Sequence, residues 1–327
     1  MPSPTRSDMH QNTPLQNFSV AAMNDDADFV LLQAAPPMPV DRASDSYYIY
    51  DTGAWNRREM RPRGSSEKAA QGGWSLSTTT YRCDRYAVEI PWDYNDVANA
   101  DAAIDPEADA AKWLAQQAKI QGEYMFGAEC FTTGIWTTNR VGASSGVAGT
   151  SFLYWDNASG DPQADAQTIH STIKGLIGKH PNVMVVGDTL HNAIVVNPQV
   201  RDAIKYTEPT MIRVVESKLA QYFGVEKYIV ASAFYNSAAE GAATVMARIL
   251  NTDSAWIGYV DPTVGTHVMT ACKTFCYNMG GRASQGTYAY SYDDPSRTST
   301  YYGIEWYVDV KTIAVDAGAY LSALLTP

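Results

Sequence analysis

The sequence predicts an α+β fold organised around one long helix, and three observations predict it. Residues 107–131 contain no proline and are rich in alanine, which favours an uninterrupted helix. Two runs, residues 46–50 and 76–90, are rich in Tyr, Thr, Val and Ile, which is typical of strands. The chain from residue 181 onward alternates short helical and strand-like patterns, as in a compact α/β unit.

The long helix has a clear start and two expected packing faces. Asp105 is an N-cap with a side-chain oxygen, Pro106 fits the first helical position, and Glu107 meets the positive end of the helix dipole. Residues 105–131 therefore predict a rod of roughly 40 Å at 1.5 Å per residue. Small side chains recur at helical spacing at Ala108, Ala111, Ala115, Ala118 and Gly122. Bulky side chains form a second stripe at Trp113, Ile120, Tyr124 and Phe131.

The chain before the helix predicts an arm followed by a projecting hairpin. Residues 1–41 are polar and interrupted by prolines, so we expect an arm that becomes ordered by lying on neighbouring subunits. It has no heptad repeat and is not expected to form a coiled coil. The segment between the two strand-like runs, residues 51–75, is glycine-rich and too polar to bury, which indicates a long hairpin loop.

Opposite charges gather in two adjacent segments. A group that we call the basic loop tip comprises Arg57, Arg58, Arg61, Arg63 and Lys68. A group that we call the acidic patch comprises Asp101, Asp105, Glu107 and Asp109. Complementary charge predicts that the two groups contact each other. The sequence leaves open whether that contact forms within one chain or between chains.

The second half predicts many short elements. In chain order we expect a loose hairpin over 132–155, a helix over 161–177, a buried strand over 181–186, helices over 189–193, 198–206 and 210–223, strands over 227–232 and 255–260, an alternating β-like run over 266–277, a tyrosine-rich hairpin over 288–292 and 301–310, and a strand with a short apolar helix over 312–325. No internal repeat is visible.

Motifs for chemistry are absent from the sequence. Neither of the glycine-rich phosphate-binding motifs occurs, nor do GxSxG or HExxH, so no cofactor is expected. His267, Cys272 and Cys276 are possible soft metal ligands, but their spacing matches no usual zinc motif, and buried thiols are the expected interpretation. A net charge of −11 argues against sequence-specific nucleic-acid binding. The apolar runs are too short to span a membrane, and the four cysteines fit a reducing cytoplasm.

Three segments, residues 180–206, 219–241 and 255–262, together with the order of the predicted elements, resemble the major capsid proteins of tailed bacteriophages, the Hong Kong ninety-seven-type or Johnson fold. The resemblance implies an α+β chain with an N-arm, an extended β-hairpin loop, a peripheral domain with a long spine helix, and an α/β axial domain. The implied domains are residues 1–41 (arm), 42–91 (extended loop), 92–178 (peripheral domain, first part, with its helix over 105–131), 179–299 (axial domain) and 300–327 (peripheral domain, second part).

The resemblance also implies a function without catalysis. Copies of the chain would form hexamers and pentamers of an icosahedral shell that encloses double-stranded DNA without sequence-specific binding, assembled in the bacterial cytoplasm and retained in the virion. The implied partners are a portal protein, a separate scaffolding protein and, in some members, a decoration protein. The family's type member crosslinks a loop lysine to a neighbour, and Lys68 lies in the corresponding loop.

Two other hypotheses stay open at the level of sequence. One is an encapsulin-like nanocompartment shell, which shares the fold and encloses an enzyme. The other is a cytoplasmic enzyme of unrecognised type, with its substrate held in the lobe formed by residues 179–260.

Overall fold

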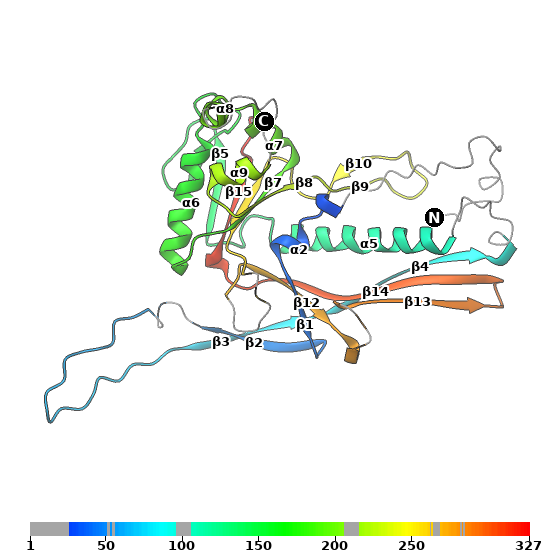
Figure 1. The fold of residues 1–327 in the computed structure, drawn as a ribbon, viewed down its shortest axis with the longest axis horizontal. Coiled ribbons are helices and arrows are strands. Elements are labelled where there is room, and N and C mark those ends of the chain that lie inside the picture. The colour runs from blue at the N-terminus through cyan, green and yellow to red at the C-terminus, as the bar shows by residue number, and fades with distance from the viewer. Residues whose placement is uncertain are drawn as a thin grey trace.

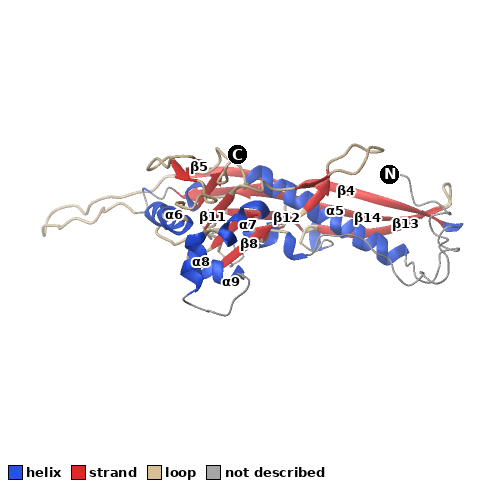
Figure 2. Cartoon of the chain, turned by 90° about the horizontal axis from the view of Figure 1, so that it is seen from above, coloured by secondary structure: helices blue, strands red, loops and turns tan. Residues whose placement is uncertain are grey.

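The computed structural model describes residues 26–50, 53, 56–95, 106–205, 216–261, 263, 269–281, 283 and 285–327. It shows a compact lobe, an elongated part that extends from the lobe, and a hairpin that projects in the opposite direction (Figure 1). The compact lobe carries a six-stranded sheet, and the elongated part carries the long helix and a five-stranded sheet. The view in Figure 2 confirms that the projecting loop and the elongated part point away from each other.

The long helix α5 spans Pro106–Glu129, close to the range predicted from the sequence. Its buried face is formed by Ala110, Leu114, Phe126 and, just beyond its end, Cys130. The predicted stripe of bulky side chains is wrong in one respect, because Tyr124 is 61% exposed. Successive residues of a helix point about 100° apart, so Phe126, two positions after Tyr124, lies on the opposite side of α5 and belongs to its apolar face.

Close packing explains one glycine of the small-residue stripe. A Cβ atom at Gly122 would lie 2.7 Å from a methyl group of Leu31 and 2.8 Å from the ring of Trp306. Side chains of the arm segment (residues 26–40) and of the sheet therefore both approach the helix backbone at Gly122, which agrees with a packing face there. Ala111 and Ala115 of the same predicted stripe are exposed.

The five-stranded sheet of the elongated part is organised by β14 (Ser299–Thr312), which pairs with three other strands. These are β4 (Asp84–Asp93), β12 (Cys272–Tyr277) and β13 (Thr287–Asp294), all antiparallel to it. The short strand β1 (Pro37–Val40) adds to β12 in parallel. The predicted tyrosine-rich hairpin is confirmed as β13 and β14, and α5 packs on one face of this sheet.

The projecting hairpin consists of β2 (Ser44–Tyr50) and β3 (Leu76–Arg82), paired in antiparallel register. This confirms the predicted hairpin for residues 44–50 and 76–82. The remainder of the second predicted run, residues 84–90, belongs instead to β4 and pairs with β14. The root of the hairpin is anchored by Tyr81, whose ring stacks on Phe275 at 4.4 Å between centroids. Beyond the paired strands, residues 56–75 form a long loop with no regular strand.

The compact lobe is built on a sheet of strand order β6-β5-β15-β11-β7-β8. Its strands are β5 (Thr138–Ala143), β6 (Ser151–Leu153), β7 (Val183–Gly187), β8 (Lys227–Ala231), β11 (Ala255–Gly258) and β15 (Gly318–Ser322). Its helices are α6 (Pro162–Ile177), α7 (Asp188–Val196), α8 (Pro198–Lys205) and α9 (Glu216–Phe223). Every residue of β7 is buried, as its unbroken apolar sequence predicts, and α6, α7 and α9 pack their apolar faces against the sheet.

Asp161 caps α6 by accepting hydrogen bonds from the N–H groups of Gln163 and Ala164, at 3.1 and 3.0 Å. Gly178 ends that helix in the left-handed conformation. A small two-stranded sheet, β9 (Phe234–Asn236) with β10 (Met246–Arg248), lies outside the main sheets. Three short 3₁₀ turns complete the described elements, at Asp26–Asp28, Met279–Gly281 and Val315–Ala317.

Two sequence-based predictions are wrong in the compact lobe. The last segment forms β15, between β5 and β11, and not a short apolar helix, because a short buried apolar run has no periodicity that separates strand from helix. The hairpin expected over 132–155 is also wrong, since β5 and β6 are parallel. In addition, β14 and β15 lie in different sheets, although the predicted domain division places both in the segment 300–327.

The arm also differs from its expectation where the structure describes it. Val30 and Leu31, at the short helix α2 (Leu31–Ala34), are buried in the core of their own chain. The prediction that only neighbouring subunits order the arm is therefore wrong for residues 26–40, and residues 1–25 lie outside the described residues. The reason is that a few apolar side chains at the right spacing suffice to dock a short segment on an existing core.

Two glycines of the compact lobe make a matched test of its packing. A Cβ atom at Gly142, in β5, would overlap the backbone carbonyl oxygen of Ala323, whereas one at Gly175, in α6, has open space around it. We expect Gly142→Ala to destabilise the subunit by about 2–3 kcal/mol and Gly175→Ala to stabilise it by about 0.5–1 kcal/mol through helix propensity. Urea unfolding of unassembled subunits measures both changes. Equal effects of the two substitutions would contradict the described approach of residue 323 to β5.

Candidate assembly interface

The basic loop tip lies on the loop beyond β2 and β3, and all five of its cationic residues are exposed. One of these positive charges is partly balanced within the loop, since Nε of Arg57 lies 3.8 Å from a carboxylate oxygen of Glu59. The loop also turns on itself where the N–H of Gly64 donates to the carboxylate of Glu67 at 3.3 Å. Arg58 and Arg61 have no ion pair or hydrogen bond within the described part of the chain, so their guanidinium groups are available to an external partner.

The acidic patch is described only in part. Glu107 and Asp109 lie exposed in the first turn of α5, and Asp109 faces Lys112 at 3.7 Å. Asp101 and Asp105 lie outside the described residues. The ends of two strands add further acids, with Asp93 on β4 and the pair Asp293 and Asp294 on β13, at the same end of the molecule as the first turn of α5 (Figure 1).

The basic loop tip and the start of α5 lie at opposite ends of the molecule. Figure 1 shows the loop beyond β2 and β3 at one extreme and the first turn of α5 at the other. The perpendicular view in Figure 2 gives the same order along the long axis. The structure therefore places Glu107 and Asp109 out of reach of the basic loop tip of their own chain. A contact between these groups requires two copies.

The sequence predicted a tyrosine-rich hairpin, but not that its tyrosines form a row on one face of the elongated sheet. Tyr288, Tyr290 and Tyr292 alternate along β13, so their rings share the sheet face opposite Trp306, and they continue onto Tyr301 of β14. Successive ring centroids are 5.9, 6.3 and 5.1 Å apart. The period-two spacing of the tyrosines was the available signal in the sequence.

A carboxylate beside this row holds two of its rings in place. Glu89 of β4 accepts hydrogen bonds from the hydroxyl of Tyr290 at 2.5 Å and from that of Tyr292 at 3.2 Å. Burial, followed by the neighbouring Glu89, raises the pKa of Tyr290 well above its ordinary value, so the hydroxyl remains a donor at physiological pH. The result is a fixed aromatic and acidic surface next to the acidic end of the molecule.

Glu123 is the described carboxylate that most resembles a catalytic acid, but its geometry is structural. It lies on α5 with 0% exposure, and the N–H groups of Val30 and Leu31 donate to its Oε2 at 3.0 and 3.1 Å. Burial raises the pKa of this carboxyl to about 7, although the two hydrogen bonds oppose the shift. Its oxygens face the backbone of their own chain and not a cavity, so Glu123 clamps the arm segment onto α5.

The cysteines behave as buried apolar side chains. Cys272 and Cys276 lie on β12 with almost no exposure, and burial raises the pKa of the Cys276 thiol to about 12. A protonated thiol is a poor metal ligand, which favours the interpretation of these residues as core packing. His267 lies outside the described residues. Among the residues that the structure describes, no group of three or more His, Cys, Asp or Glu side chains is arranged to hold a metal ion.

Within the described ranges, no helix combines the length and the apolar character needed to cross a bilayer.

No protein-family model matches this sequence, and no curated protein matches it. Solved structures match it over nearly its whole length. A phage-related protein from Bordetella bronchiseptica RB50 is 17% identical and has a TM-score of 0.69, covering 93% of this chain and 95% of that chain. The capsid structure of the cyanophage P-SCSP1u is 11% identical and has a TM-score of 0.61, covering 97% and 94%. The chain has the Hong Kong ninety-seven-type capsid fold.

This fold confirms the fold class predicted from the sequence. A structure outside the phage capsids also matches. The encapsulin of the holo-SrpI complex from Synechococcus elongatus PCC 7942 is 10% identical and has a TM-score of 0.54, covering 94% of this chain and 92% of that chain. Both shell hypotheses raised by the sequence therefore lie within one fold, and the elements that form the fold are those that carry the basic loop tip and the acidic end.

The clamp at Glu123 predicts a pH dependence of subunit stability. Between its ordinary value of 4.5 and about 7, the folded chain keeps a proton on Glu123 that the unfolded chain has released. Stability contributed by this group is thus present at acid pH and falls as the pH rises through that window, by on the order of 3 kcal/mol.

In Glu123→Gln this titration is absent, so the stability of the variant relative to wild type should increase as the pH rises through the same window. Urea unfolding of unassembled subunits at several pH values measures the difference. Other carboxyls with raised pKa values, such as Asp165, titrate in both proteins and cancel. Parallel stability curves for the two proteins would contradict the clamp.

Proposed function

We propose that this protein is the major capsid protein of a tailed bacteriophage and that its copies assemble into an icosahedral shell around packaged double-stranded DNA. The observation that carries the proposal is the fold match with phage capsid structures, which covers nearly all of both chains. We expect no catalytic activity, because the described carboxylate with the most suitable pKa, Glu123, is enclosed by the backbone of its own chain. A net charge of −11 suits a wall that must not grip its DNA.

Assembly follows from the projecting hairpin. An isolated two-stranded ribbon is marginally stable in water. In the described part of this hairpin, Tyr47 and Tyr81 pack on Phe275 of their own chain, whereas residues 60–75 of the loop are exposed. The rest of the loop needs another surface. We propose that the basic loop tip of one subunit docks on the acidic patch of a neighbour, where Glu107 and Asp109 are exposed.

The energy of this contact comes from many weak pairs. Each exposed ion pair contributes only about 0–1 kcal/mol, but arginine grips carboxylates with two parallel hydrogen bonds, and the contact repeats at every subunit. Assembly should also weaken with salt, because the screening length falls from about 10 Å at 0.1 M to about 3 Å at 1 M. The partners that we propose are further copies of this chain, a portal protein and a separate scaffolding protein, with a decoration protein as an optional addition.

The second candidate function is an encapsulin-like shell, and the match to an encapsulin structure is the observation that supports it. The two functions differ in what the shell contains and in the genes beside it. A portal and a terminase gene next to this gene would support the capsid, whereas a gene for a cargo enzyme would support the encapsulin.

The direct test is to express the protein and examine it by sedimentation and negative-stain microscopy. Closed shells are the expected result, alone or with the scaffolding protein supplied. A monomer at all concentrations and salts, with turnover of some metabolite, would refute a shell function. Denaturing gels of the shells address the crosslink at Lys68, since a single band at the subunit mass excludes it.

The docking contact has its own prediction. Arg58→Glu with Arg61→Glu should raise the subunit concentration needed for assembly by at least about tenfold, because each reversal turns attraction into repulsion. The subunit should remain folded, since both side chains are exposed and make no ion pair or hydrogen bond in the described part of their chain. Light scattering against subunit concentration measures the effect.

Two control variants make this test specific. Arg58→Lys with Arg61→Lys keeps the charge but loses the paired hydrogen bonds of arginine, so its assembly should fall between wild type and the charge reversals. Glu107→Lys with Asp109→Lys should partly restore assembly of the arginine reversals. Normal assembly of the arginine reversals would show that the docking assignment is wrong.

A further inference from the structure

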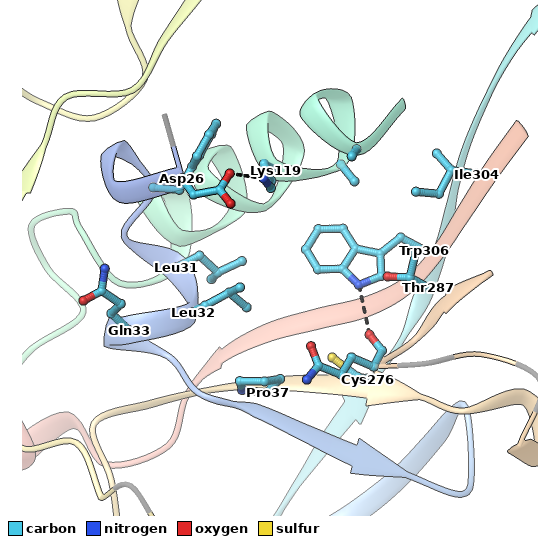
Figure 3. A pocket seen from close by; sticks show the side chains of 14 residues that line it. Asp26, Leu31, Leu32, Gln33, Pro37, Lys119, Cys276, Thr287, Ile304 and Trp306 are labelled. Atoms are coloured by element: carbon cyan, nitrogen blue, oxygen red, sulfur yellow. Dashed lines mark hydrogen bonds and ion pairs between the residues drawn. The ribbon is translucent and has the colours of Figure 1, made fainter. Parts of the chain in front are cut away.

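An apolar groove lies between the arm segment, α5 and the strands β13 and β14 (Figure 3). Its volume is about 400 Å³, within the range of pockets that hold a ligand. Apolar side chains form most of its lining, including Leu31, Leu32, Ile304 and Trp306. One charged pair, Lys119 with Asp26, lies at its edge.

The groove leaves apolar surface uncovered in the described structure. Leu32 is 55% exposed although it sits on the arm segment whose other apolar side chains are buried. Ala115, on the neighbouring face of α5, is also exposed. Uncovered apolar surface beside a concave cavity is typical of a surface that another segment covers.

The chain itself supplies a suitable segment. Residues 1–25 precede the described part, which begins at Asp26 on the edge of this groove. Leu15, Phe18 and Val20 are apolar side chains within that stretch. Eight residues separate Phe18 from Asp26, and an extended chain of that length reaches up to about 27 Å, which is enough to place Phe18 anywhere in the groove.

We propose that the N-terminal segment of the same chain, through Leu15, Phe18 and Val20, occupies the groove between the arm segment, α5 and β13–β14. The short tether favours the segment of the same chain, since it holds the apolar side chains at a high effective concentration beside the cavity. The groove is apolar with a single charged pair at its edge, which matches a segment without Lys or Glu between Leu15 and Met23. The inference concerns the unassembled subunit and does not depend on the capsid proposal.

Cleavage by chymotrypsin after Phe18 tests the proposal on unassembled full-length subunits. Release of the fragment that ends at Phe18, followed by mass spectrometry, gives the rate. In wild type the bound segment is cut only when it leaves the groove. Leu32→Glu places a charge on the exposed edge of the groove and should accelerate the cut by at least about tenfold.

Two further variants keep the test decisive. Ala115→Phe fills the groove from an exposed helix position and should give the same acceleration even if Leu32→Glu disturbs the arm. Leu176→Glu changes a 38% exposed leucine on α6, away from the groove, and should leave the rate unchanged. Equal cleavage rates in wild type, Leu32→Glu and Ala115→Phe would overturn the proposal and leave the groove to another partner.

The dependence on concentration identifies the chain that supplies the segment. Protection of Phe18 that does not change with subunit concentration supports occupancy within one chain. Protection that appears only as the subunit concentration rises would overturn it in favour of the segment of a second copy.

Discussion

The structure depends on one apolar core that joins the arm segment, α5, the compact lobe and the sheet of the elongated part. Val30 of the arm segment, Phe126 of α5, Trp256 of the compact lobe and Trp306 of the long strand β14 belong to the same buried cluster. The rings of Phe126 and Trp256 meet edge to face at 6.2 Å between centroids. Because close-packed interiors transmit displacement, the elongated part cannot tilt against the compact lobe without disturbing that contact.

The sequence predicted correctly those elements whose ends or burial are determined by residues close together in the chain. Pro106 at the start of α5, Asp161 and Gly178 at the ends of α6, and the unbroken apolar run of β7 each carry the physical reason for their structure. The failures are of the opposite kind. The strand β15 and the buried Glu123 depend on partners far along the chain, and no spacing of nearby residues reveals such partners.

The features of the candidate interface also fall into those visible in nearby residues and those that depend on distant partners. Composition alone found the basic loop tip, because a polar, arginine-rich segment between two strands has few other interpretations. The tyrosine row needed the pairing of β13 with β14, since Tyr292 meets Tyr301 only in that register. Whether the two charged groups meet in one chain depends on the overall shape of the molecule, which charge patterns do not contain.

The separation of the basic loop tip and the acidic end along the long axis has a consequence for symmetry. A contact between them joins two different surfaces, so it is heterologous, and a two-fold axis cannot generate it from a single patch. After each addition, the growing assembly keeps a free basic loop tip at one end and a free acidic end of a subunit at the other. Such contacts continue until a rotation closes the ring, and the angle between the two surfaces of the subunit decides whether the product is a closed ring or an open filament.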